Sequence, residues 1–403
     1  MREKTVELIK NKIPTITFCS VWIFLLCYFA QFLDFPNELT MLLGGTLCLI
    51  LVLQQKKLRV DVGICLLTLT MVSYYFIVNS ISGLFFSILY IPLVIYELGN
   101  YSVCKIKNEN NRDRKLLLLL SALIIGFVIY GILNSYMWYA GYAVPGTRRW
   151  QDFWSGEIVP GTQHSVYFLP VFACFLPSVL YIKNRKWISL VVIITTTFFG
   201  YTSLATKSRM SILIFAIVIV VQILLFILLE REIVEKQLKN KQLWIAGSVL
   251  LVFFTIILIA FKDSNVIAVF IANMGKDGGI LNNVRFTAQR LALQQLFVYP
   301  MGGNMMELGK LSQAHNMWLD IANAAGIIPF FAFTAYTVHT MYEIIRMFRK
   351  KEMSTEIKLI FIGIYVAFFL YFTVEPALEA SVHLVTPWIF VNGMVHGWLT
   401  KNT

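Results

Sequence analysis

The sequence predicts an all-α protein that crosses a membrane many times. Hydrophobic residues make up 58% of the 403 positions and charged residues only 14%, and the mean hydropathy is +0.71. Average soluble domains are about 45–50% apolar and about 25% charged. Long apolar runs also alternate with short polar segments along the whole chain. This composition excludes a soluble multidomain protein, so we treat residues 1–403 as a single transmembrane domain.

The apolar runs predict about 12 membrane-spanning helices. A bilayer core of about 30 Å is crossed by roughly 20 apolar residues in an α-helix, which satisfies its own backbone polar groups. Each run falls close to that length. The runs lie near residues 15–33, 39–53, 62–78, 83–100, 116–136, 164–182, 187–204, 210–229, 243–261, 317–345, 359–374 and 384–399.

The basic residues predict the orientation of these spans. If the N- and C-termini are cytoplasmic, only nine of the 34 Lys and Arg residues fall in extracytoplasmic loops. Cytoplasmic loops of membrane proteins carry such an excess of positive charge. The net charge of +12 therefore reports orientation and attraction to the anionic lipid bilayer. It gives no reason to expect a nucleic acid partner.

Two predicted extracytoplasmic loops carry candidate site residues. The loop 137–163 holds Arg148 and Arg149 among several aromatic residues, and His164 opens the span that follows. Aromatic rings pack on apolar faces and the arginine fork suits phosphate oxygens, so this loop could bind a charged glycan. An interfacial aromatic belt with anchoring arginines has the same composition. His164 is either a polar residue at a helix start or a group that lines the site, and the sequence leaves both alternatives open.

The larger loop, 262–316 between helices 9 and 10, carries further candidates. A helix is predicted near 283–299, with Arg285 and Arg290 five positions apart. They therefore lie about 140° apart around the helix axis and do not grip one phosphate together. His315 and Asn316 open the next span, where a histidine is either a capping residue or a site residue. Carboxylates in the extracytoplasmic loops are alternative bases, namely Asp152, Asp277 and Glu307.

Three motifs together resemble the superfamily of O-antigen ligases and Wzy-type O-antigen or capsular polysaccharide polymerases. Ser208-Arg209 stands at the outer start of a mid-chain span. Arg285 lies fifteen residues before the segment from Pro300 to Gly303. His315-Asn316 is followed after nine residues by Gly326. The resemblance covers about residues 190–330, and the order of the motifs and their side of the membrane also agree.

The resemblance implies a GT-C-like membrane glycosyltransferase in the bacterial inner membrane, with an extracytoplasmic active site. Its donor is an undecaprenyl-pyrophosphate-linked oligosaccharide, and its acceptor is the hydroxyl of a lipid-linked repeat unit. The implied transfer is inverting and uses no metal or other cofactor, and a chain-length regulator is a further expected partner. Arg209 and Arg285 would stabilise the pyrophosphate, His315 would act as general base, and Asn316 would orient it or the acceptor. The other expected substrate-binding residues are Ser208, Arg148, Arg149 and His164.

Other functions remain open from the sequence. A ligase would transfer the glycan to a terminal acceptor. A metal-dependent glycosyltransferase would need Asp34 and Glu38 in the short first outer loop. The spacing of Glu379 and His383, with Glu375 nearby, is typical of metal ligands on one helix face. A lipid-linked oligosaccharide flippase would place ionisable groups near the bilayer midplane. Those within the predicted spans stand near span ends, namely Asp61, Glu97, Asp320, His339, Glu343 and His396.

Overall fold

The computed structural model describes residues 2–82, 86–104, 112–145, 147–181, 185–206, 208–230 and 284–400. It is 77% helix and 2% strand, and six of its helices are long and apolar enough to cross a membrane. The prediction of a helical membrane protein is confirmed at this level. The count of 12 spans stays a prediction, because the run 243–261 and loop residues 262–283 lie outside the described residues.

The described chain forms sixteen α-helices and one short hairpin. The first helices are α1 (Arg2–Phe29), α2 (Asn37–Leu39), α3 (Gly45–Gln55), α4 (Val62–Ser82), α5 (Phe86–Cys104) and α6 (Arg112–Tyr139). The strands β1 (Arg149–Gln151) and β2 (Ile158–Pro160) pair antiparallel. The helices α7 (Gly161–Ser165), α8 (Leu169–Leu180), α9 (Lys186–Ala205) and α10 (Arg209–Leu229) follow. The last are α14 (Val284–Gln295), α15 (Met317–Ala325), α16 (Ile327–Phe348), α17 (Thr355–Phe372), α18 (Ala377–Ala380) and α19 (Thr386–Thr400).

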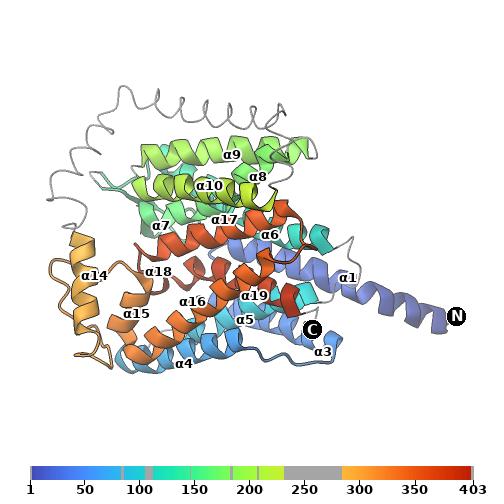
Figure 1. Cartoon of the computed structure of the whole chain (residues 1–403), viewed down its shortest axis with the longest axis horizontal. Coiled ribbons are helices and arrows are strands. Elements are labelled where there is room, and N and C mark those ends of the chain that lie inside the picture. Colours follow the sequence, from blue (N-terminus) through green and yellow to red (C-terminus); the bar gives the residue numbers. More distant parts are fainter. Residues whose placement is uncertain are drawn as a thin grey trace.

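Most long helices run side by side along the length of the molecule, and α14 crosses one end of this bundle almost at a right angle (Figure 1). The labels for α7, α15 and α18 lie toward the same end as α14, whereas the marked ends of the chain lie toward the other. The described parts of the predicted loops 137–163 and 262–316 thus share one end of the bundle. Their position relative to a membrane stays a prediction.

Helices α5 and α19 touch backbone to backbone at the centre of the bundle. A Cβ atom at Gly393 would lie 2.1 Å from the carbonyl oxygen of Tyr96, and one at Gly397 would lie 2.3 Å from that of Asn100. Gly99 on α5 faces the carbonyl of Phe390 in the same way, at 2.5 Å. Small residues four positions apart on one helix face allow this close approach, which van der Waals contact then stabilises.

A buried glutamine on α10 is hydrogen-bonded to both α8 and α17. Gln222 of α10 donates one amide hydrogen to the carbonyl of Ala173 in α8 (2.7 Å) and the other to that of Leu359 in α17 (2.8 Å). A Cβ atom at Gly363 would lie 2.4 Å from the Gln222 amide nitrogen, so the glycine makes room for it. Both amide donors are thereby satisfied away from water.

The glycine contact predicts a matched pair of substitutions. Gly393→Ala should lower the stability of the protein by about 1–3 kcal/mol, because the added methyl group overlaps the Tyr96 carbonyl. Gly45→Ala is the control, because a Cβ atom there meets nothing within 4 Å. Thermal unfolding of both variants in detergent measures the difference. Equal melting temperatures for the two would contradict the close contact.

Candidate functional site

One carboxylate joins two of the predicted catalytic residues. Glu375 follows α17 directly and is only 7% exposed. Its Oε1 accepts a hydrogen bond from Nη1 of Arg285 at 3.0 Å, and the same nitrogen donates to the carbonyl of Val374 at 2.9 Å. Its Oε2 lies 3.7 Å from Nδ1 of His315. Arg285, Glu375 and His315 therefore form one cluster of ionisable side chains, which we call the outer triad.

The helix α14 is fixed to this cluster by a second side chain. Gln289 lies one turn after Arg285, so both point from the same face of α14. Its amide donates to the carbonyl of His315 and to that of Thr373, each at 3.1 Å. His315 itself has a φ of +52°, a left-handed conformation that is rare outside glycine. These bonds hold the strained residue in place.

The start of α15 fixes the backbone on both sides of His315. The Asn316 side chain caps the helix by accepting from the backbone N–H of Leu319 at 3.2 Å, and it donates to the Thr373 carbonyl at 3.3 Å. The Asp320 carboxylate accepts from the N–H of Ala314 at 2.6 Å and from that of Asn316 at 2.8 Å. Capping bonds of this kind satisfy donors that a helix leaves unpaired at its N-terminus. Asn316 is therefore a positioning residue.

The segment from Pro300 to Gly303 packs onto the far end of α15. The N–H of Ile327 donates to the Pro300 carbonyl and that of Gly303 to the Ala324 carbonyl, both at 2.9 Å. Gly326 has a φ of +86°, and a Cβ atom there would lie 2.2 Å from the Pro300 oxygen. Only glycine fits this position. The His315-Asn316 motif therefore lies at the start of α15, and the segment from Pro300 to Gly303 lies against its end.

Two other predicted site residues are buried by packing. His164 is 2% exposed and stacks on Trp150 with 4.3 Å between the ring centroids. Ser208 is 4% exposed, and its hydroxyl accepts from that of Ser211 at 3.2 Å. Arg209 is the first residue of α10, and its side chain lies outside the described residues. The outer triad includes none of these three, so their binding roles stay predictions.

The described part of the loop 137–163 contains a short hairpin of β1 and β2. Arg149 lies in β1 opposite Pro160, and the side chains of Arg148 and Arg149 are exposed. Asp152 is 4% exposed, and its carboxylate accepts from the backbone N–H of Trp154 at 2.9 Å and from the Tyr130 hydroxyl. These bonds make Asp152 a structural residue.

The remaining alternative bases are placed differently. Glu307 is exposed, and its backbone N–H and carbonyl both bond to the Gln295 side chain. Asp277 lies outside the described residues.

A cavity of about 370 Å³ lies beside the outer triad. It is bounded by Asn37, Tyr74, Val78, Asn304, Ala324, Leu378, Glu379, Ala380, Ser381, Val382 and His383. The Glu379 carboxylate accepts from the Gln313 amide at 2.9 Å. Burial raises the pKa of Glu379 to about 8, with help from the nearby Asp320 carboxylate. Burial lowers the pKa of His383 to about 4. Near neutral pH both groups are therefore largely uncharged.

The alternative metal ligands Glu379 and His383 do not lie on one helix face. The i, i+4 spacing brings ligands together only on a continuous helix, but α18 ends at Ala380 and Ser381 is extended, with φ −170°. Among the described residues, the group of three or more side chains that could hold a metal ion lies elsewhere, at Asp61, His339 and His396.

The contact of Glu375 with both Arg285 and His315 is the feature that the sequence did not predict. The sequence held one clue to this contact. Glu375 follows an apolar span on the same predicted side of the membrane as Arg285 and His315. No model of a known protein family matches the chain, and neither does any curated protein.

The buried carboxyl of Glu379 predicts a pH dependence of stability. Its folded-state pKa of about 8 exceeds the ordinary 4.5, so folding favours the protonated form. The stabilisation is complete below the ordinary value and is lost as the pH rises through the folded-state value. Thermal unfolding in detergent should show a decrease in Tm across this range that is smaller in Glu379→Gln. The exposed Glu307→Gln variant should retain the wild-type profile, and a wild-type profile in Glu379→Gln would contradict the assignment.

Proposed function

We propose that the chain is a membrane glycosyltransferase that polymerises a lipid-linked glycan. It transfers the glycan from an undecaprenyl-pyrophosphate donor to a hydroxyl of a lipid-linked repeat unit. The observation that carries the proposal is the outer triad, in which Glu375 contacts a predicted phosphate-binding arginine and a predicted base from separate parts of the chain. Residues from two of the three motifs of the resemblance, Arg285 and His315, thereby share one carboxylate partner.

Arg285 has the chemistry for the leaving group. When the bond from the anomeric carbon to the phosphate oxygen breaks, negative charge grows on the pyrophosphate. A guanidinium held in place by a carboxylate and a carbonyl can stabilise that charge without first reorganising. Arg209, at the start of α10, is the proposed second cation.

His315 has the chemistry for the acceptor. Its Nε2 accepts the proton of the attacking hydroxyl as the new bond to the anomeric carbon forms. The imidazolium that results is stabilised by Glu375, whose carboxylate faces the other ring nitrogen at 3.7 Å. Such contacts are often long before substrate binds and shorten in the reacting complex. A single displacement of this kind inverts the anomeric carbon and needs no metal at the outer triad.

The neighbouring cavity suits the acceptor glycan. Gln313 connects the two places, because its amide bonds to Glu379 in the cavity wall and it stands two residues before His315. A protonated Glu379 and the amide of Asn304 offer hydrogen-bond donors and acceptors to sugar hydroxyls. Their lack of net charge suits a neutral glycan.

Substitutions in the outer triad should abolish polymerisation by the purified, reconstituted protein supplied with a pyrophosphate-linked repeat unit. His315→Ala removes the base and should lower the rate by about 10²–10⁴-fold. Arg285→Ala should lower it by about 10²–10³-fold. Arg290→Ala, an exposed arginine on the same helix, is the control and should retain the wild-type rate. Wild-type rates in both triad variants would show that the site is elsewhere.

The products separate the alternative functions. A polymerase gives a ladder of glycan lengths, whereas a ligase gives transfer to a terminal acceptor without a ladder. A flippase moves the lipid-linked glycan across the vesicle membrane without a new glycosidic bond. A metal-dependent enzyme that uses the first outer loop would lose activity in Asp34→Asn and Glu38→Gln, whereas the proposed mechanism predicts that both variants are active.

A further inference from the structure

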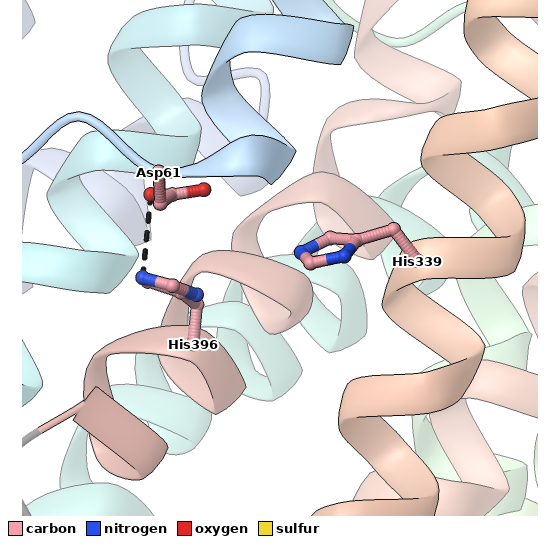
Figure 2. Close-up of side chains that lie close together, drawn as sticks. All are labelled: Asp61, His339 and His396. Carbon is pink, nitrogen blue, oxygen red and sulfur yellow. Dashed lines mark ion pairs between the residues drawn. The ribbon is translucent and has the colours of Figure 1, made fainter. Parts of the chain in front are cut away.

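A second cluster of ionisable side chains lies away from the outer triad. Asp61 directly precedes α4, His339 lies in α16, and His396 lies near the C-terminal end of α19. One possible ligand atom from each lies within 4.8 Å of the other two. Figure 2 shows the three side chains converging on one space from three separate elements.

The distances suit a small divalent ion. Oδ2 of Asp61 lies 3.3 Å from Nε2 of His396. Zinc binds nitrogen and oxygen ligands at about 2.0–2.1 Å in tetrahedral geometry, which separates two ligand atoms by about 3.4 Å. Within the described part of the chain, Oδ2 of Asp61 and Nε2 of His339 are buried and make no hydrogen bond. Their ion-pair contacts are long, at 3.3 Å from Asp61 to Nε2 of His396 and 3.6 Å from His339 to Oε1 of Glu343. Buried polar atoms are rarely left this way, and one bound ion would satisfy the cluster.

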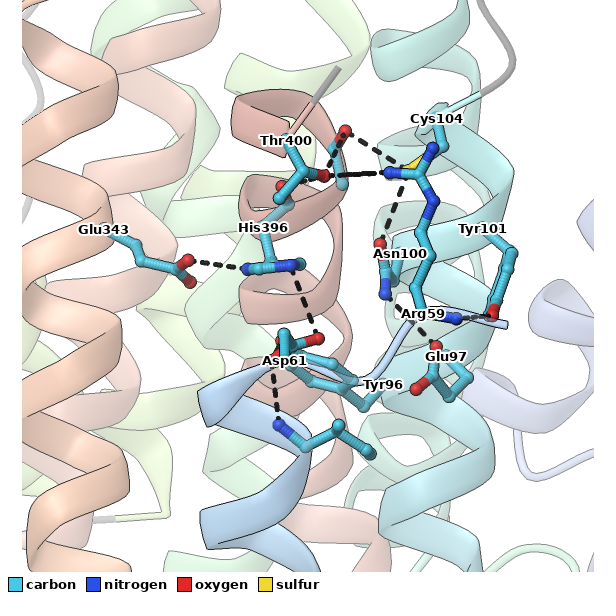
Figure 3. Close-up of polar contacts among 12 residues, drawn as sticks. Arg59, Asp61, Tyr96, Glu97, Asn100, Tyr101, Cys104, Glu343, His396 and Thr400 are labelled. Atoms are coloured by element: carbon cyan, nitrogen blue, oxygen red, sulfur yellow. Dashed lines mark hydrogen bonds and ion pairs between the residues drawn. The ribbon is translucent and has the colours of Figure 1, made fainter. Parts of the chain in front are cut away.

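The neighbouring groups orient the ligands as they do in metal sites. Nδ1 of His396 lies 2.6 Å from Oε1 of Glu343, and its Nε2 faces Asp61 (Figure 3). Metal-binding histidines typically donate their second ring N–H to a carboxylate in this manner. Oδ1 of Asp61 accepts from the N–H of Ile64 at 2.9 Å and from the Tyr96 hydroxyl at 3.0 Å. Its Oδ2 is thereby turned toward the histidines.

Charge and space also favour an ion. The carboxylates of Asp61 and Glu343 together balance a divalent cation bound by two neutral imidazoles. A Cβ atom at Gly63 would lie 2.9 Å from Oδ1 of Asp61 and 2.8 Å from the Tyr96 hydroxyl, so the glycine keeps side chains away from these groups.

We propose that Asp61, His339 and His396 bind one divalent transition-metal ion of the zinc type, with water as the fourth ligand. Two imidazole nitrogens and one carboxylate oxygen are ligands that zinc prefers. The ion joins the start of α4 to α16 and α19 and thereby stabilises the inner half of the bundle. It takes no part in the chemistry proposed for the outer triad.

Metal analysis of the purified full chain tests the proposal. After equilibration with Zn²⁺ and removal of the excess, the wild type should retain about one ion per chain, whereas Asp61→Asn and His339→Gln should lose it. Glu343→Gln should weaken zinc binding about 10–100-fold, because Glu343 is not a ligand but faces both histidines, at 2.6 Å from His396 and 3.6 Å from His339. His315→Gln is the matched histidine control at the other end of the bundle and should keep the ion.

Cobalt gives a readout that needs no variant. Co²⁺ bound in the wild type should show the intense visible d–d absorption of a tetrahedral site, and Zn²⁺ should displace it. Wild-type protein without stoichiometric metal and without this absorption would overturn the proposal. So would a folded His339→Gln variant, checked by gel filtration, that binds zinc as tightly as the wild type.

Discussion

The close contact between α5 and α19 is the constraint on which the packing of the bundle depends. Because Gly99, Gly393 and Gly397 carry no side chains, the two backbones meet without intervening atoms. In lipid, where apolar side chains gain little by leaving their surroundings, such contact is a main source of helix association. It also brings His396 on α19 and Tyr96 on α5 to opposite sides of the Asp61 carboxylate.

The end of the bundle that holds the outer triad is organised by ion pairs as well as by close packing. Glu375 there is the shared partner of Arg285 and His315, and the backbone around His315 is held by amide and carboxylate side chains. A buried carboxylate is costly unless it is paired. The same pairing orders a cation and a histidine, which is what the proposed electrostatic catalysis requires.

Composition was enough to predict a helical membrane protein, because a lipid environment permits few other structures. The site was predictable only in part. Arg285 and His315 stand in recognisable local patterns. The role of Glu375, in contrast, depends on its contact with Arg285, which lies 90 positions earlier in the chain. The spacing of Glu379 and His383 misled because the helix stops between them. Burial of Ser208 and His164 depends on tertiary packing, which local sequence does not encode.

The bonds of Gln222 have a consequence for how the protein is made. A glutamine amide within an apolar helix finds no acceptor among lipid chains. One of its two acceptors, Ala173, precedes it in the chain, but the other, Leu359, is synthesised 137 residues later. During synthesis α10 can therefore pair with α8 at once but must wait for α17. The hydrogen bonds that join α8 and α10 to α17 are thus completed only when the C-terminal part of the chain has been made.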